Sequence, residues 1–304
     1  MAEEKSHLQF FFAPSLRSRM EIIMSYKIVV DSCCELPEEF KNDSRFERVP
    51  LGLEVGDWRI QDDENFNQKE FLRKVAECPI CPRSSCPSPE RYLASYEGEA
   101  EHVYVVTLSA NLSGSHNSAL LGKNLFEEKY GRDAKKIHVV DSKSASCGET
   151  QIALKAMQLE EEGRSFEEIV QTLESFRDEM NTWFVLNNLE TLRKNGRLTG
   201  VKALVASTLN IKPVMGATPE GTIIQRGQAV GLKKALIRMA GLVADETKNP
   251  QDKCLMISHC NNPEKAEWVR DMIMEKAAFS GSRILNTAGI SSMYANDGGI
   301  IIAV

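Results

Sequence analysis

A serine-rich turn in the first half of the chain carries the residue types best suited to holding an anion. Residues 107–118 read Thr-Leu-Ser-Ala-Asn-Leu-Ser-Gly-Ser-His-Asn-Ser. Ser113 and Ser115 offer hydroxyl donors, and Gly114 lets the backbone come close to a ligand. This chemistry suits a carboxylate or a phosphate, and the same serines would also serve as an ordinary helix cap.

The elements around this turn are expected to place it at one edge of a sheet. An apolar run at 102–106 is typical of a buried parallel strand, and residues 118–126 repeat apolar side chains at helical spacing. In open α/β sheets, ligands bind where the strands end, and the start of the next helix adds free N–H groups and a positive dipole end. The sequence therefore predicts an anion site between this strand and this helix.

The two halves of the chain show different patterns of elements. The first half alternates strands and helices, which predicts a βαβ arrangement with a mostly parallel sheet. Its expected strands and helices include 27–31, 67–78, 102–107, 136–142 and 149–162, with a helix start at Ser88-Pro89. The second half mixes helices with a hairpin, which predicts α+β. Its expected elements are 166–180, 183–186, 187–194, 212–215, 222–225, 233–246, 253–259, 263–279 and a terminal strand.

We therefore predict an α/β protein of two domains, since 304 residues exceed what one small core needs. Residues 1–24 are assigned to an N-terminal extension. The α/β domain is predicted to span 25–164 and the α+β domain 165–304, with the boundary near the turn at Gly163.

Composition excludes several classes of function. A net charge of −6, with no cluster of Lys or Arg, argues against a nucleic-acid partner. No apolar stretch approaches the roughly 18 residues of a membrane span, so we expect no stable membrane insertion and a cytoplasmic protein. The eight cysteines are then expected to be reduced thiols. Cys78, Cys81 and Cys86 lack a matching fourth ligand, so we expect no metal, and nothing indicates a cofactor.

Several segments, taken in order, resemble the DegV family of bacterial fatty-acid-binding proteins, which includes the lipid-carrying subunit of fatty acid kinase. The likeness extends over about residues 26–304. It is carried by Lys27-Ile28-Val29-Val30-Asp31-Ser32, Val49-Pro50-Leu51, Ser84-Ser85-Cys86-Pro87-Ser88, Leu112-Ser113-Gly114-Ser115, Val140-Asp141-Ser142, the run Leu189-Glu190-Thr191-Leu192-Arg193-Lys194-Asn195-Gly196-Arg197-Leu198, and Ile211-Lys212-Pro213.

The resemblance implies a two-domain α/β protein that holds one long-chain fatty acid in a tunnel between its domains. It implies that hydroxyls at the tunnel mouth hold the carboxylate, here Ser84 or Ser85 together with Ser113. It further implies a non-catalytic role, in which a separate ATP-dependent kinase subunit phosphorylates the bound carboxylate. The serine-rich turns suit such a ligand on chemical grounds as well.

Two departures from the family pattern concern the kinase partner. Tyr294 stands where the family commonly has a histidine, and an unperturbed phenol stays neutral at pH 7. The family often has an Arg shortly before a Lys-Lys pair, whereas Val230-Gly231-Leu232 precedes Lys233 here. Arg197 matches the family's Gly-Arg pair and is either a cation at a helix end or a residue near the ligand. We expect ligand binding to survive both departures.

Two other functions stay open at this stage. A serine-dependent acyl hydrolase using Ser113 would need an oriented base, and the sequence around His116 has no nucleophile elbow. A binding protein for a phosphate or sugar acid would use the same hydroxyls with a shorter, more polar cavity. A co-purifying fatty acid would separate these alternatives.

Overall fold

A parallel sheet organises the first half of the molecule. The computed structural model describes residues 26–198 and 210–304. Among these, four parallel strands pair in the order β2-β1-β6-β7. Their bounds are β1 (Tyr26–Asp31), β2 (Phe46–Val49), β6 (His102–Thr107) and β7 (Lys136–Asp141). The strands alternate their side chains between two helical layers, with Val29 on one face and Ile28 on the other.

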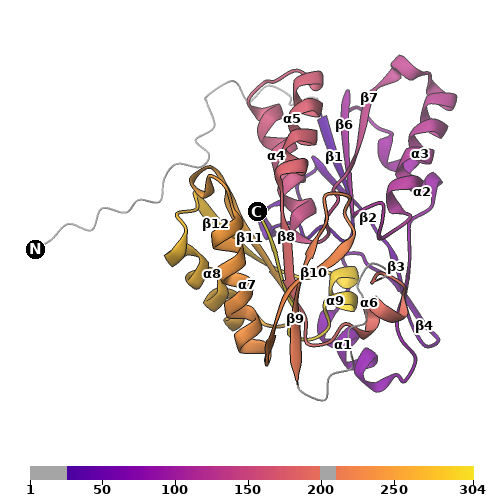
Figure 1. The fold of residues 1–304 in the computed structure, drawn as a ribbon. Helices are drawn as coiled ribbons and strands as arrows, with labels where there is room; N and C mark the ends of the chain where they lie inside the picture. The colour runs from indigo at the N-terminus through magenta and orange to yellow at the C-terminus, as the bar shows by residue number, and fades with distance from the viewer. Residues whose placement is uncertain (1–25, 199–209) are drawn as a thin grey trace, which may run out of the picture.

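Helices cover both faces of this sheet (Figure 1). The first layer contains α2 (Pro89–Tyr96) and α3 (Ser115–Tyr130), and the second contains α4 (Cys147–Glu161) and α5 (Phe166–Glu179). Ser88 caps α2 through its side chain, as predicted, and Pro89 occupies the first turn. Short 3₁₀ turns lie at Glu38–Phe40, Arg132–Ala134 and Pro250–Asp252.

A small antiparallel sheet formed by the first half packs against the last helix of the described chain. It contains β3 (Gly52–Val55), β4 (Trp58–Gln61) and β5 (Arg83–Ser85), in the order β4-β3-β5. Together with α1 (Gln68–Glu77) it packs on α9 (Gly289–Ala295) through a shared apolar cluster that includes Leu53, Phe71 and Ile290. Residues more than 200 positions apart in the sequence thus lie side by side.

The second half is built on a mixed sheet. Six strands of the described chain pair in the order β10-β9-β8-β13-β11-β12, and only β11 and β12 run parallel. The elements are β8 (Thr182–Val185), α6 (Glu190–Lys194), β9 (Ile211–Ala217), β10 (Ile223–Val230), α7 (Leu232–Glu246), β11 (Cys254–His259), α8 (Pro263–Lys276), β12 (Gly281–Asn286) and β13 (Ile300–Ala303). Helices α7 and α8 cover one face, and α4 of the first half packs against β11 and β13.

This architecture confirms the predicted fold class, a parallel sheet followed by a mixed α+β part. Some local expectations were wrong or incomplete. Helix α3 begins at Ser115 rather than Ser118, and β5, β12 and α9 were not predicted. Helix α5 follows the predicted boundary at 164/165 but packs on the first sheet, and that boundary stays a prediction. The proposed extension at 1–24 lies outside the described residues.

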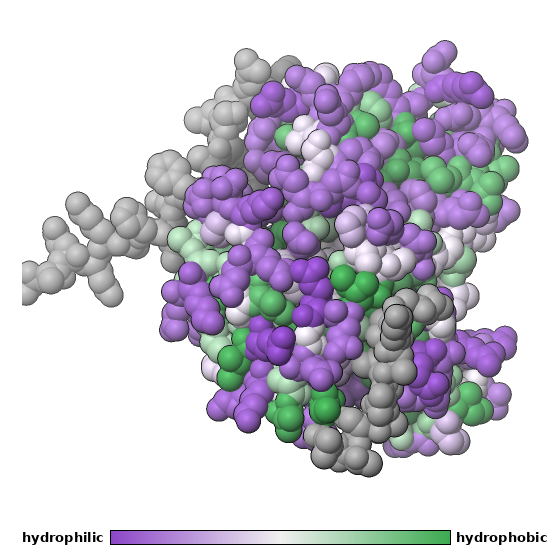
Figure 2. Space-filling model, in the orientation of Figure 1, coloured by the Kyte–Doolittle hydropathy of each residue, from purple (hydrophilic) through white to green (hydrophobic). Residues whose placement is uncertain are grey.

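No helix within the described parts of the chain is both long and apolar enough to cross a bilayer. The face shown in Figure 2 is mainly hydrophilic, with hydrophobic residues in separate patches. The large apolar side chains lie mostly in the interior instead.

Candidate functional site

An apolar pocket lies between the two halves of the molecule. It encloses about 740 Å³, its open mouth included, and apolar atoms form nearly all of its wall. Concave sites with apolar walls of this kind usually take organic ligands. The first half contributes Cys33, Leu108, Leu112, Lys143, Ser144, Ala145 and Ser146. The second half contributes Thr182, Phe184, Leu186, Leu192, Arg197, Gly216, Ala217, Gly221, Thr222, Ile223, Ile290, Ser291, Tyr294, Ala295 and Ile301.

On one side of this pocket, two hydroxyls from distant segments face each other. Ser84 on β5 lies with its Oγ 3.2 Å from the phenol oxygen of Tyr294 on α9. Burial raises the pKa of Tyr294 above its ordinary value, although Ser84 and Arg197 oppose that shift. Tyr294 is therefore a neutral hydrogen-bond donor at physiological pH.

Arg197 completes this side, which we call the Arg197 side of the pocket. Its guanidinium carbon lies 5.8 Å from the centroid of the Tyr294 ring, within cation–π range. Its Nε donates to the Leu112 carbonyl at 3.1 Å, and Nη1 donates to the Asn195 carbonyl. Among the described residues no carboxylate lies within ion-pairing distance of Arg197. Backbone carbonyls thus hold the guanidinium in place, and no carboxylate in the described parts of the chain neutralises its charge.

The Ser113 turn borders the same region from outside. Ser113 and Gly114 line an open, polar hollow that shares Arg197 and Leu112 with the apolar pocket. A Cβ on Gly114 would lie only 3.1 Å from Cys86 Sγ, so this turn and the Ser84–Ser85 segment lie close together. Two of the segments singled out in the sequence therefore meet at the place where apolar pocket and polar hollow join.

Two of the serines named from the sequence point elsewhere. Ser115 is fully buried, and its Oγ lies 2.7 Å from Asp31 Oδ2 and 2.6 Å from the Tyr92 hydroxyl. Ser85 lies over Gly52, whose added Cβ would come within 2.4 Å of Ser85 Oγ. Since neighbouring strand residues face opposite sides, Ser85 points away when Ser84 faces Tyr294. Ser115 and Ser85 are therefore left out of the site proposed below.

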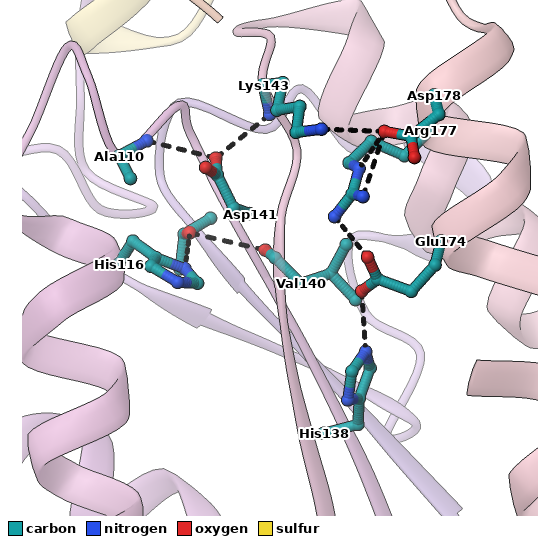
Figure 3. A network of polar contacts seen from close by, with 10 residues as sticks. Ala110, His116, His138, Val140, Asp141, Lys143, Glu174, Arg177 and Asp178 are labelled. Carbon is teal, nitrogen blue, oxygen red and sulfur yellow. Dashed lines mark hydrogen bonds and ion pairs between the residues drawn. The ribbon is translucent and has the colours of Figure 1, made fainter. Parts of the chain in front are cut away.

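A second cation borders the pocket, on what we call the Lys143 side, and this one is neutralised. Lys143 Nζ lies 2.8 Å from Asp178 Oδ1 on α5, as Figure 3 shows. Arg177 pairs with the same carboxylate at 2.9 Å and continues the network to Glu174. The hydroxyls here are also paired, since Ser144 Oγ lies 2.7 Å from Thr182 Oγ1.

Buried acids lie behind the pocket wall. Burial, and then the neighbouring Asp31, raises the pKa of Glu149 well above its usual range. Neither carboxyl oxygen of Glu149 has a hydrogen-bond partner within the described residues. Burial also raises the pKa of Glu35 to about 7, although the Ser146 and Ser258 hydroxyls favour its charged form. These groups are candidates for neutral, structural carboxyls rather than ligand contacts.

His116 does not form a pair with Ser113. Its Nδ1 lies 3.2 Å from Thr107 Oγ1, and burial lowers the pKa of His116. Across residues 26–198 and 210–304, no group of three or more His, Cys, Asp or Glu side chains is arranged to hold a metal ion.

Known proteins share this fold along nearly the whole chain. The sequence model described as "Uncharacterised protein, DegV family" matches residues 25–302. A DegV domain-containing protein of Streptococcus gordonii is 35% identical over 287 residues, which cover 92% of this chain and 98% of that protein.

Solved structures extend the likeness to three dimensions. A DegV family protein of Ruminococcus gnavus, refined with vaccenic acid, is 56% identical with a TM-score of 0.89, covering 92% of this chain and 99% of that one. The fatty acid kinase (Fak) B3 protein of Streptococcus pneumoniae, loaded with linoleic acid, is 31% identical with a TM-score of 0.82, covering 92% and 99%.

Proposed function

Because the chain belongs to the DegV family, we propose that it binds one long-chain fatty acid in the pocket between its two halves. The acyl chain occupies the apolar interior, and the carboxylate lies on the Arg197 side. Ser84, Tyr294 and Ser113 donate hydrogen bonds to the carboxylate, and Arg197 supplies the positive charge. The related R. gnavus protein, described with vaccenic acid, supports this class of ligand.

One observation carries the proposal: an apolar pocket ends beside hydroxyl donors and an unneutralised cation. A fatty acid has this same division between a chain that avoids water and a head group that needs donors. A carboxylate moved out of water requires several hydrogen bonds to offset its desolvation. Each buried methylene of the chain adds about 0.8 kcal/mol of favourable transfer energy.

The protein's role is to carry the lipid rather than to convert it. His116 bonds to Thr107, so Ser113 has no base beside it to activate it as a nucleophile. The polar hollow next to Ser113 leaves the head-group end open toward solvent, where a separate enzyme could reach it. We propose that a fatty acid kinase catalytic subunit is such a partner, since the similar S. pneumoniae protein is described as a Fak B3 protein.

The ligand is tested by native mass spectrometry of the protein purified from bacteria, followed by solvent extraction and mass analysis. The expected result is one noncovalent long-chain fatty acid for each chain. A co-purifying phosphorylated sugar or sugar acid, or no lipid at all, would contradict the proposal. Release of a free fatty acid and an alcohol from an added acyl ester would favour the hydrolase instead.

Coupling to a kinase is a separate test. Tyr294 can give one neutral hydrogen bond, whereas a protonated histidine could form an ion pair with the carboxylate. We therefore expect slow acyl-phosphate formation when the protein is incubated with a fatty acid kinase catalytic subunit, ATP and labelled oleate. Tyr294→His should accelerate the reaction. Fast turnover by the unaltered protein would show that a histidine at this position is not needed.

A further inference from the structure

A buried carboxylate outside the pocket holds the start of the helix that carries Tyr294. Asp62 directly follows β4 and is fully buried. Its Oδ1 accepts a hydrogen bond from the Gly289 N–H at 2.8 Å, and its Oδ2 accepts one from Ile290 N–H at 2.8 Å. These are the first two residues of α9, whose N–H groups have no partner inside the helix.

The contact is close enough to fix where α9 begins. A Cβ on Gly289 would come within 2.7 Å of Asp62 Oδ1 and within 2.6 Å of Leu53 Cδ1. Arg48 lies nearby and donates to the backbone carbonyl of Asp62 at 3.1 Å. The helix therefore sits directly on the Asp62 carboxyl group, and its first residue must be glycine for the two to meet.

The same small sheet also carries the hydroxyl that faces Tyr294. Asp62 follows β4 and Ser84 lies on β5, and both strands pair with β3. Gln68 on α1 adds bonds to the Thr287 carbonyl and to Ser292 Oγ, at 2.9 and 3.0 Å. The small sheet and α1 thus contact both the start of α9 and, through Ser84, its Tyr294.

We propose that Asp62 is a positioning residue for the head-group site, which sets Tyr294 opposite Ser84 by anchoring the first turn of α9. The inference rests on the proposed function. Asp62 itself does not contact the ligand. Its effect on binding passes through Tyr294. Loss of Asp62 should therefore weaken binding of the ligand's carboxylate without changing how the acyl chain binds.

The test compares two ligands on two variants. Asp62→Asn replaces one acceptor oxygen by an NH₂ group, which cannot accept the second helix N–H. Asp63→Asn is the matched control, because among the described residues the Asp63 carboxylate accepts a hydrogen bond only within its own turn, from the Asn65 N–H. We expect Asp62→Asn to weaken oleate binding by about two- to tenfold, no more than loss of the Tyr294 hydroxyl does. Oleyl alcohol should stay within about twofold, whereas Asp63→Asn changes neither.

A double variant separates positioning from general damage. In the Tyr294→Phe background, Asp62→Asn should cause no further loss of oleate affinity, because the two changes remove the same interaction. Equal losses for acid and alcohol, or fully additive losses in the double variant, would overturn the proposal. If Asp62→Asn does not fold, Gly289→Ala is the second variant. Its added Cβ would lie 2.7 Å from Asp62 Oδ1 and so disturb the same contact, and it must give the same loss for the acid alone. If the unaltered protein binds neither ligand, the proposed function fails, not the role of Asp62.

Discussion

The two sides of the pocket contain similar groups, but they differ in whether the cation is paired with a carboxylate. Each has a cation and hydroxyls beside the apolar interior, Arg197 with Ser84 and Lys143 with Ser144. On the Lys143 side the cation is paired with Asp178 and the hydroxyl with Thr182. On the Arg197 side the guanidinium contacts carbonyls and an aromatic ring.

This difference decides where a carboxylate should bind. An anion on the Lys143 side would have to compete with Asp178 for the same ammonium group. On the Arg197 side it would meet a cation that pairs with no carboxylate of the described residues, beside the Ser84 and Tyr294 hydroxyls. Residue composition around a pocket is therefore a weaker guide than whether its polar groups already have partners.

The largest effect is expected from filling the Lys143 side of the pocket. Ala217 ends β9 and directly precedes the turn whose Gly221 packs on Lys143. In Ala217→Trp the indole should displace three or four methylenes of a long chain, which weakens oleate about a hundredfold. Decanoate should be affected far less, since its chain ends before that region. Ala134→Trp, on the exposed 3₁₀ turn, is the control for titration calorimetry.

A paired charge removal tests the comparison itself. Arg197→Gln should weaken oleate by about ten- to fiftyfold, because hydrogen bonds to a charged partner contribute about 1.5–3 kcal/mol. Lys143→Gln should change oleate affinity by less than about twofold, because the Lys143 ammonium already forms a partly exposed ion pair with Asp178. The reverse ranking would place the carboxylate on the Lys143 side.

The serines should divide in the same way. We expect Ser113→Ala and Ser84→Ala each to weaken oleate about tenfold by removing a donor to a charged group. Ser85→Ala is the matched control for Ser84, and a loss below about twofold is expected because Ser85 lies over Gly52. Competition with a fluorescent fatty acid measures all three. Unchanged binding by Ser113→Ala would remove that turn from the site.

The smallest effect is expected at Tyr294. Tyr294→Phe keeps the ring beside Arg197 and removes one neutral hydrogen bond, worth about 0.5–1.5 kcal/mol, so affinity should fall about two- to tenfold. The alcohol analogue should bind as before. A loss that is equal for acid and alcohol would indicate that Tyr294 only packs under the terminal strand.

The sequence predicted the fold better than it predicted the site. Long periodic elements such as α5 and β6 have strong local signals, and Ser88 with Pro89 marks the start of α2. Helix α9 has a short, small-residue sequence without such a signal. Its first two N–H groups donate to Asp62, which follows a strand more than 200 residues earlier.

The site serines show the same limit. Ser113 and Ser115 are two residues apart in one motif, yet Ser115 serves the buried carboxyl of Asp31. Asp31 is the last residue of β1, which is far from Ser115 in the sequence but pairs with β6, the strand that leads into the Ser113 turn. A motif can therefore indicate the chemistry of a turn, but the partners of each hydroxyl depend on tertiary contacts.

The most direct test of the account is a crystal structure of the protein with bound oleate. We predict one oleate in the pocket between the two halves. Its carboxylate should lie within hydrogen-bond distance of Ser84, Tyr294 and Ser113 and close to Arg197, and its chain should run along Phe184 and Ile301. A carboxylate beside Lys143, or an oleate bound outside this pocket, would contradict the central claim.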